Sequence, residues 1–355
     1  MNAEPPPPSE AQVAEHVARL LRTHERLLAD GVRNRAFHTA LSRAVRPGSV
    51  VLDIGAGTGV WAIAAALLGA KKVVAIEADE ILTGMIQRLA SECGVGDRVK
   101  AVWGLSTQIQ LAREFDLVVS ETIGYDGFEE QIVPIMADAR NRFLRPGGAI
   151  IPETVGLFAA PSRYQRTPGT LPRGLPFTFN AFSRMSLHAP LRLRHPTRLR
   201  LLGRPKRLLE VDLMAPPTPS VLEHLQATWK VSDSRTINCF AVWVESRLGP
   251  GVRLTTRRTT SWSPVLYRFD PIDMREGRIS FDLSLASTPS WTLTARGAGP
   301  AVSQQYSAAS AARRMLLDLR LRSAALSPHG ASLVERLADP GDPHHRCLAE
   351  RGSPE

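Results

Sequence analysis

The stretch that most constrains the fold is Val50–Val60, with the sequence VVLDIGAGTGV. An apolar strand that ends in Asp53 leads into Gly55, Gly57 and Gly59, and an apolar helical run follows. A strand that turns sharply on glycines into a helix directs backbone N–H groups and the positive helix end at a ligand. The glycines permit positive φ and close approach of the backbone. The stretch therefore predicts a cofactor-binding turn.

A second acidic residue helps to identify the cofactor. The next predicted strand ends at Glu77, and a carboxylate at that point of a βαβ unit suits a ribose diol. Dinucleotide enzymes favour G-x-G-x-x-G beneath a pyrophosphate, whereas the spacing here is G-x-G-x-G and Asp53 lies two residues before Gly55. That carboxylate would repel a pyrophosphate but tolerate an ammonium and a sulfonium. The pattern favours S-adenosylmethionine over NAD, and the alternative is a turn that only packs a helix on a sheet.

Strands and helices alternate over residues 48–152, which predicts a doubly wound, mainly parallel α/β sheet. The expected strands are Ser49–Asp53, Lys72–Glu77, Val99–Trp103, Phe115–Ser120 and Ala149–Pro152, and the expected helices are Trp61–Leu68, Ile81–Ser91 and Glu129–Phe143. Ligands of such sheets bind at the carboxyl ends of the strands. The glycine loop, the ribose carboxylate and the loop after Ser120 should therefore meet at one edge.

The rest of the chain has a different sequence pattern. Residues 1–10 are proline-rich and predicted to be disordered, and residues 11–45 form amphipathic lid helices interrupted at Asp30. The cofactor domain spans 46–160, and an antiparallel β-barrel-like substrate domain spans 161–300, with a basic arm at about 170–212. A C-terminal helix and tail fill 301–355, with the helix at 302–326.

Composition narrows the protein class. The 355 residues are 43% hydrophobic, which is enough for a real core, and carry a net charge of +10. Such a charge suggests anionic surroundings without identifying a nucleic-acid binder. The basic run at 192–207 contains no interleaved aromatic residues, so we do not expect nucleic acid as a partner. Cys93, Cys239 and Cys347 fit neither a metal site nor a disulfide framework, which favours a reduced, cytoplasmic setting. We expect no secretory signal, membrane span or metal.

The loop after the fourth strand should carry the chemistry. Residues 121–130 contain four carboxylates in an otherwise basic chain: Glu121, Asp126, Glu129 and Glu130. A guanidinium is their best geometric match, because a carboxylate accepts two of its N–H groups in a planar fork. Glu121 and Glu130 are the predicted pair. The alternative is that these acids cap the following helix, which is the favoured interpretation of Glu129.

At this point the sequence resembles the protein arginine methyltransferases. The family loop S-E-x-x-G-Y-x-x-x-x-E matches residues 120–130, and the family V-L-D-x-G-x-G-T-G matches residues 51–59. The helix motif H-E-x-x-L-x-D-x-V-R corresponds to residues 24–33 and P-G-G-x-I-x-P to residues 146–152, with a weaker echo of the threonine-histidine-tryptophan loop at residues 260–262. The resemblance covers about residues 11–297.

The resemblance implies a role for each matching residue. Gly55, Gly57 and the supporting Asp53 would form the cofactor loop, and Glu77 would bind the ribose. His24 and Arg33 would lie over the methionine part of S-adenosylmethionine, with Arg33 near its carboxylate. The substrate-side roles fall to Glu121 and Glu130 as guanidinium ligands, Asp30 as a proton acceptor or relay, and Tyr125 and Trp262 as substrate contacts. The resemblance also implies a head-to-tail homodimer formed through the arm.

Three departures from the family pattern bear on function. The first helix carries no aromatic residue, Ser261 replaces the loop histidine that would contact Asp30, and Ser106 stands where members often place a glutamate for the adenine amine. The loss of the loop histidine is expected to remove the contact to Asp30. The matching motifs imply an N-methyltransferase acting on a protein or peptide arginine. The alternatives are an enzyme for free arginine or another small guanidine or amine, and a scaffold without activity.

Overall fold

The computed structural model describes residues 9–125, 127–165, 180–193, 199–215, 222–285, 289–297 and 300–307. Its contacts divide the chain into two compact units. The first comprises residues 1–158, 209–217 and 243–264, and the second comprises 159–208, 218–242 and 265–355. Two segments from the second half of the chain therefore belong to the first unit.

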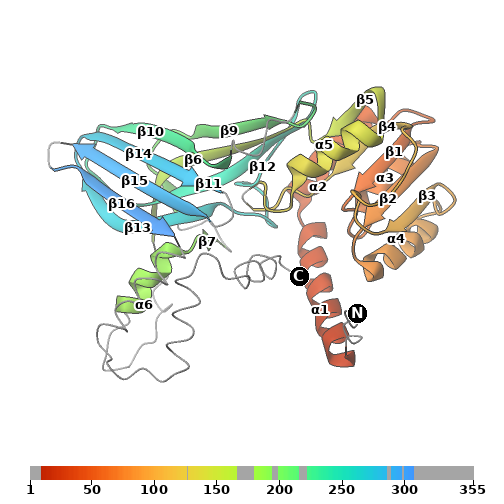
Figure 1. Ribbon diagram of the computed structural model, residues 1–355, viewed down its shortest axis with the longest axis horizontal. Coiled ribbons are helices and arrows are strands. Elements are labelled where there is room, and N and C mark those ends of the chain that lie inside the picture. Colours follow the sequence, from red (N-terminus) through yellow and green to blue (C-terminus); the bar gives the residue numbers. More distant parts are fainter. Residues whose placement is uncertain are drawn as a thin grey trace, which may run out of the picture. The chain divides into compact units, whose positions relative to one another are not determined.

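The first unit contains a five-stranded sheet in the order β3-β2-β1-β4-β5, and every pair within it is parallel (Figure 1). The strands are β1 (Val50–Ile54), β2 (Lys72–Glu77), β3 (Val99–Trp103), β4 (Phe115–Ser120) and β5 (Leu144–Ile151). β1 is buried throughout, as a strand of valine, leucine and isoleucine between two neighbours should be. The predicted doubly wound α/β fold is confirmed.

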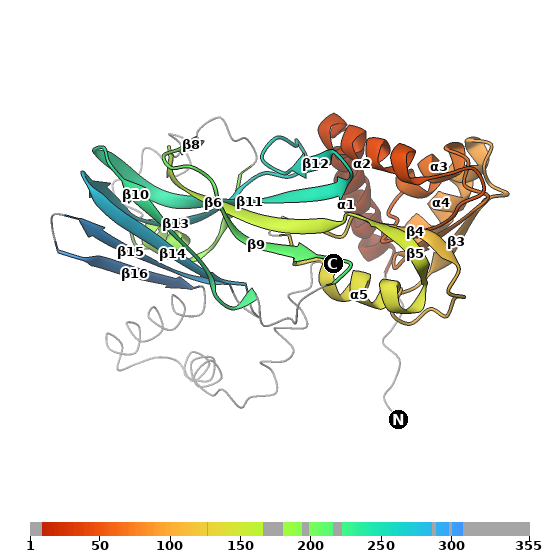
Figure 2. The ribbon, with the colours of Figure 1, turned by 90° about the horizontal axis from the view of Figure 1, so that it is seen from above.

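Helices cover the sheet on both faces. They are α3 (Val60–Leu67), α4 (Glu80–Glu92) and α5 (Ile132–Arg142). In Figure 2, α5 lies on one side of β4 and β5, and α2 (Gly31–Ala44) lies on the other side. The helix α4 begins where the Asp79 carboxylate accepts hydrogen bonds from the backbone N–H groups of Ile81 and Leu82, a standard N-cap. The α3 helix instead begins after Gly59 in the left-handed region, at φ 80°.

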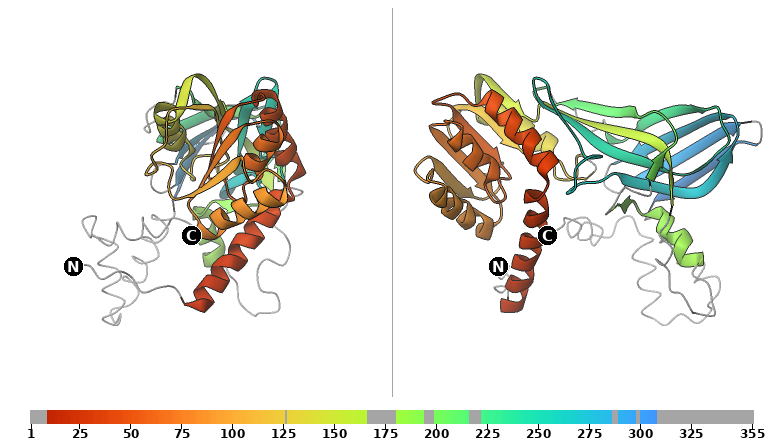
Figure 3. Two further views of the ribbon diagram at one scale, coloured as in Figure 1. Left: turned by 90° about the vertical axis from the view of Figure 1, so that its right-hand side faces the viewer. Right: turned by 180° about the vertical axis from the view of Figure 1, so that it is seen from behind.

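Two helices precede the sheet, as predicted, and Figure 3 shows the break between them. α1 (Glu10–Leu28) starts with a capping box, in which Ser9 and Gln12 each accept a hydrogen bond from the other's backbone N–H. The N-cap of α2 is Asp30. The α1 helix has no buried residue, whereas α2 buries Phe37 and Leu41 completely. The second helix is therefore the one integrated into the core.

The remaining strands form two further sheets that contain antiparallel pairs. A four-stranded sheet in the second unit has the order β10-β14-β15-β16, visible in Figure 1. A second sheet has the order β7-β13-β11-β6-β8, with β12 paired to β11 and β9 to β6. The strands are β6 (Thr154–Tyr164), β7 (Leu191–Arg192), β8 (Leu199–Leu201), β9 (Lys206–Asp212), β10 (Leu225–Val231), β11 (Arg235–Gly249), β12 (Val252–Thr255), β13 (Val265–Met274), β14 (Gly277–Ser284), β15 (Ser290–Gly297) and β16 (Val302–Ser307). The short α6 (Asn180–Met185) and a 3-10 turn (Ser186–His188) precede β7.

Three sequence predictions need correction. Ser9 and Glu10 are not disordered, since they cap and begin α1; residues 1–8 lie outside the described part. The helix predicted at 302–326 is wrong for Val302–Ser307, because these residues alternate in burial and pair with β15; residues 308–355 lie outside the described part. The predicted helix start at Glu129 is also wrong, since α5 begins at Ile132.

We expect Phe281→Ala to destabilise the second unit strongly. Phe281 is 1% exposed and stacks on Phe240 with ring centroids 4.3 Å apart, so truncation leaves a large cavity. The free energy of unfolding should fall by about 3–5 kcal/mol in urea denaturation. Thr292→Ala, a change on the opposite face of the same sheet, is the control and should cost less than about 1 kcal/mol. Equal losses would contradict the described inward face.

Candidate active site

The glycine loop after β1 has the backbone that the sequence predicts. Gly55 and Gly57 have φ of 68° and 57°, in the left-handed region. A Cβ on Gly57 would lie 2.9 Å from the His24 ring, and one on Gly55 would lie 2.6 Å from the Thr122 side chain. The loop is therefore closely covered by α1 on one side and by the segment after β4 on the other.

Glu77 fixes the loop from the end of β2. Its Oε2 accepts a hydrogen bond of 2.7 Å from the N–H of Gly57, and its Oε1 accepts one of 2.9 Å from the N–H of Asp79. A carboxylate has about four lone-pair sites, so each oxygen keeps capacity for a hydroxyl donor. The arrangement is compatible with the predicted ribose contact.

Asp53 is completely buried at the end of β1. Its Oδ2 accepts a hydrogen bond of 2.9 Å from the N–H of Ala62, while its Oδ1 has no hydrogen-bond partner in the part of the chain that the structure describes. Burial raises the pKa of Asp53 to about 7, and the nearby carboxylates of Glu77 and Glu121 add to the rise. A buried acceptor without a donor is costly, so the site favours a ligand that brings a donor or a positive charge.

These features fit S-adenosylmethionine. An orphaned buried acceptor, a ribose-type carboxylate and a loop without side chains are what a cationic nucleoside ligand needs. His24 fits as well, because burial lowers its pKa and favours the neutral imidazole over a second cation; Glu77 opposes this effect, and Arg33 reinforces it.

The N-terminal helix is attached to the same edge of the sheet. His16 on α1 forms a 2.6 Å contact from Nε2 to Asp79 Oδ2, and Arg19 donates to His16 Nδ1 at 2.9 Å. His24, two turns further along, reaches the glycine loop. These contacts support the predicted position of the N-terminal helices near the cofactor loop.

Asp30 joins α2 to the loop that follows β12. Its Oδ1 accepts hydrogen bonds from the N–H groups of Val32 and Arg33 at 3.2 and 3.1 Å. Its Oδ2 accepts three more: 2.9 Å from the N–H of Thr260, 2.8 Å from the N–H of Ser261 and 2.5 Å from the Ser261 hydroxyl. Ser261 therefore maintains a contact to Asp30 with a hydroxyl where the family pattern has an imidazole.

The charge state of Asp30 follows from these bonds. Burial alone would raise its pKa, but the hydrogen bonds from Ser261, Arg33 and Thr260 outweigh burial and lower the pKa below its usual value. Asp30 is thus a firmly ionised carboxylate and a weak base. Its geometry suits positioning of the two segments better than the proton relay that the family resemblance implies.

Arg33 lies next to Asp30 and pairs with the first acid of the loop. Both its Nε, at 2.9 Å, and its Nη2 donate to Glu121 Oε2. Its Nη1 donates to Asn34 Oδ1 and to the carbonyl of Leu27. These bonds use four of the five guanidinium donors, which leaves one N–H on Nη2 for a cofactor carboxylate. The side chains of Arg33 and Glu121 are 4% and 8% exposed, so this is a buried ion pair.

Only one oxygen of Glu121 is engaged by Arg33. Oε1 accepts no hydrogen bond from any residue in the described ranges. Burial raises the pKa of Glu121, and the neighbouring guanidinium of Arg33 partly offsets this. The location follows from the sheet, because Ser120 pairs with Ile54 in the parallel ladder and its hydroxyl donates to the Ile54 carbonyl at 2.9 Å. Glu121 therefore emerges directly beside the glycine loop.

Two tryptophans flank the Arg33 guanidinium. Its central carbon lies 5.1 Å from the ring centroid of Trp61 and 5.9 Å from that of Trp262, within the range of cation–π contacts. Trp61 in turn stacks on Phe37 at 4.9 Å. Trp262 was a predicted site residue, whereas Trp61 and Phe37 were not. An aromatic residue directly after the glycine loop was the available signal for Trp61.

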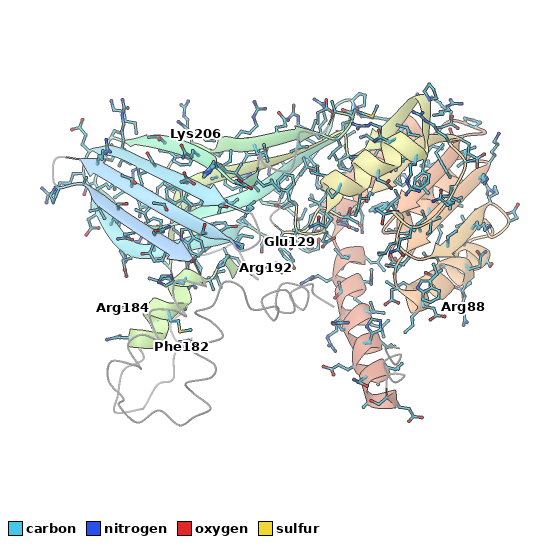
Figure 4. All side chains as sticks on the ribbon, viewed as in Figure 1. Arg88, Glu129, Phe182, Arg184, Arg192 and Lys206 are labelled. Atoms are coloured by element: carbon cyan, nitrogen blue, oxygen red, sulfur yellow. The ribbon has the colours of Figure 1, made fainter. Side chains whose placement is uncertain are left out.

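The other loop acids are arranged differently. Glu129 folds back over the loop, where its Oε1 accepts a hydrogen bond of 3.0 Å from the N–H of Tyr125, and it lies against Gly124. Its predicted role as a helix cap is wrong, since α5 has no side-chain cap. Figure 4 labels Glu129. Glu130 is exposed whereas Glu121 is buried, so the pairing of these two stays a prediction. Asp126 lies outside the described residues.

Ser106, the predicted adenine contact, is buried after β3, and its carbonyl accepts a 2.6 Å hydrogen bond from Arg142 Nη2. No group of three or more His, Cys, Asp or Glu side chains able to hold a metal ion occurs among the described residues. Within those same ranges, none of the helices combines the length and the apolar content needed to cross a lipid bilayer.

Several known proteins are similar to this chain. Residues 38–157 match the family model for ribosomal protein L11 methyltransferase (PrmA). The chain is 36% identical over 141 residues to protein arginine N-methyltransferase 6 of Danio rerio, which covers 39% of this chain and 40% of that protein. It is 32% identical over 162 residues to a probable protein arginine N-methyltransferase 6 of Arabidopsis thaliana, covering 45% of this chain and 37% of the relative.

Solved structures extend the similarity in fold. The Trypanosoma brucei PRMT1 enzyme–prozyme complex with AdoHcy superposes with a TM-score of 0.68 at 19% identity, covering 80% of this chain and 96% of that one. Protein arginine methyltransferase 10 of Arabidopsis thaliana gives a TM-score of 0.67 at 18% identity, with the same coverage.

The parallel sheet with its glycine loop and the antiparallel β part together have the fold of these two solved structures. Over the matched residues, the chain is similar in sequence to protein arginine N-methyltransferases. It spans about 40% of the length of the curated relatives that it matches.

We expect Asp30→Asn to destabilise the first unit in a pH-dependent way. The folded state lowers the pKa of Asp30, so its stabilisation is complete above the unfolded pKa of about 4 and is lost as the pH falls through the lower folded value. At pH 7 the substitution should cost about 1.5–3 kcal/mol in urea denaturation, and the difference should shrink below about pH 4. Asp97→Asn, at an exposed site, is the control. A loss in the free energy of unfolding that does not change with pH would contradict the ionised state of Asp30.

Proposed function

We propose that the protein is an S-adenosylmethionine-dependent N-methyltransferase that modifies the guanidine of a protein or peptide arginine. The observation that carries this proposal is the state of Glu121. One of its oxygens is held by Arg33 and the other accepts no hydrogen bond among the described residues, beside a loop suited to a cationic nucleoside. A carboxylate with one oxygen held by Arg33 and the other open in that place favours a second guanidinium.

The residues around the glycine loop would hold the cofactor. Glu77 would accept the ribose hydroxyls, neutral His24 would cover the loop, and the remaining N–H of Arg33 would bind a carboxylate. Ser106 stays a candidate for the adenine end. When bound, S-adenosylmethionine supplies an electrophilic methyl group on a sulfonium. Asp53 would balance part of that positive charge from within the sheet.

Glu121 would prepare the acceptor. A guanidinium is protonated up to a pH of about 12 and its lone pairs are delocalised, so it is a poor nucleophile. A carboxylate hydrogen-bonded to two of its nitrogens biases the positive charge onto these two and leaves electron density on the third. Glu121 would hold one side, and Glu130 is proposed for the other, with Tyr125 and Trp262 contacting the substrate. The proton leaves the reacting nitrogen during or after transfer, and Asp30, as a weak base, positions Arg33.

Much of the barrier would be removed by holding the acceptor nitrogen and the methyl group at attack distance. The buried Arg33–Glu121 pair serves this purpose, because its members are fixed by four hydrogen bonds and two aromatic rings. A fixed carboxylate needs no reorganisation when the charge shifts.

A small guanidine or amine, such as free arginine, is the second candidate substrate. It is favoured by the exposure of Glu130 and by the absence of any aromatic residue from α1, since both leave less structure to grip a peptide chain. We further propose a homodimer formed through the arm at 170–212, whose described part exposes Phe182 and Met185, and a cytoplasmic location suited to unpaired cysteines.

One assay separates these substrates. The protein is incubated with methyl-labelled S-adenosylmethionine and, in separate reactions, an arginine-rich peptide, free arginine or a cell lysate. Label on the peptide or on lysate proteins supports the proposed function, and label on free arginine alone supports the second candidate. No transfer to any acceptor would favour a scaffold without activity.

We expect Glu121→Gln to reduce kcat by about 10²–10³-fold, because the amide cannot draw the positive charge away from the reacting nitrogen. Affinity for S-adenosylhomocysteine, measured by calorimetry, should change far less. Glu129→Gln and Glu130→Gln are the comparisons, and only Glu130→Gln should also lower kcat. Equal loss of turnover and cofactor affinity in Glu121→Gln would count against the assignment.

We also expect Gly57→Ala to weaken cofactor binding. The new Cβ would meet the His24 ring at 2.9 Å in a backbone conformation that alanine rarely adopts, so both α1 and the loop must shift. The dissociation constant for S-adenosylhomocysteine should rise at least about tenfold, which corresponds to about 1.4 kcal/mol. Gly84→Ala, at a helical site with nothing within 4 Å of the added Cβ, is the control and should leave binding unchanged.

A further inference from the structure

A row of three like charges crosses the four-stranded sheet of the second unit. Lys230 on β10 is directly opposite Arg278 on β14, and Arg278 is directly opposite Arg296 on β15. All three side chains are exposed. Like charges placed directly opposite each other on neighbouring strands destabilise a sheet. The row thus opposes the stability of the sheet that carries it.

No acid of the described residues neutralises the row. The ion pairs in this unit include Asp233 with Arg235, but no ion pair within the described ranges includes Lys230, Arg278 or Arg296. Asp282, on the same face of β14, accepts a hydrogen bond from Gln226. Neighbouring strands are about 4.8 Å apart, so the three backbone positions span about 10 Å. Like charges thus face each other across the strands without a contact that compensates for their repulsion. Such unfavourable local arrangements are expected at functional sites.

The positions beside the row are polar and uncharged. The next register row is Thr228, Ser280, Thr294 and Ser303, and the hydroxyls of Thr228 and Ser280 lie 2.8 Å apart. A fourth cation is close, since Lys206 Nζ donates to the Thr228 carbonyl at 2.5 Å; Figure 4 labels Lys206. The face thus offers cations followed by hydroxyl donors and acceptors.

This chemistry favours one kind of partner. None of the outward positions in these rows is aromatic, so a single-stranded nucleic acid finds no stacking surface. A longer phosphate backbone that continued along the face would be repelled by the carboxylate of Asp282. A short run of carboxylates has a length that matches the row of cations, which is about 10 Å. We propose that Lys230, Arg278 and Arg296 form a docking site for a short acidic peptide segment of a partner protein. This proposal is independent of the methyl-transfer site.

The charge reversal Arg278→Glu tests the proposal. It places an acid between two cations, so the sheet should become more stable and the melting temperature should rise, while the docking site is destroyed. A gain in stability together with a loss of binding excludes unfolding as the cause of that loss. Arg88→Glu, an exposed cation of α4 that Figure 4 labels, is the matched charge change.

The probe is a fluorescein-labelled peptide of eight glutamates, measured by anisotropy at several salt concentrations on the full chain. We expect binding that weakens with salt, at least tenfold weaker binding by Arg278→Glu, and wild-type affinity within twofold for Arg88→Glu. An eight-glutamine peptide should not bind. A 20-base-pair DNA duplex is tested in the same way. The proposal is overturned if the glutamate peptide does not bind, if both variants bind it equally, or if Arg278→Glu loses binding only to the DNA.

Discussion

The site depends on one buried carboxylate, Asp30, which accepts five hydrogen bonds from two segments far apart in sequence. On one side it caps α2, and on the other it fixes the loop at Thr260 and Ser261. These two anchors bring Trp262 over the guanidinium of Arg33, and Arg33 in turn holds one oxygen of Glu121. An ionised, fully bonded side chain thus determines where the acidic loop presents its remaining acceptor.

The parallel half of the fold could be predicted because its signals are local. The ranges Lys72–Glu77, Val99–Trp103 and Phe115–Ser120 are apolar runs bounded by polar or turn residues, and the structure has the same bounds for all three. The antiparallel half was predicted in kind, but β16 was taken for the start of an amphipathic helix, because Ala311, Met315, Leu316 and Leu319 follow it at helical spacing. Its strand character comes from pairing with β15, a contact that sequence periodicity does not contain.

The site shows the same limit. The glycine loop, Glu77 and Glu121 were identifiable because each ends or directly follows a strand that reaches the ligand edge of the sheet. The contribution of Ser261 was predicted wrongly, because its replacement of the loop histidine was expected to remove the contact to Asp30, whereas its N–H and its hydroxyl both donate to the Asp30 carboxylate. Glu129 was misjudged because its partner, the N–H of Tyr125, is fixed by the turn at Gly124 rather than by the helix.

A crystal structure of the complex with S-adenosylhomocysteine and an arginine peptide would test the central claim most directly. The distance from Glu121 Oε1 to the nearest guanidinium nitrogen of the peptide is the quantity to measure. We expect about 2.7–2.9 Å, the range of a charge-assisted hydrogen bond, with Arg33 still bound to Oε2. A guanidinium held elsewhere, with Glu121 occupied on both oxygens by Arg33, would contradict it.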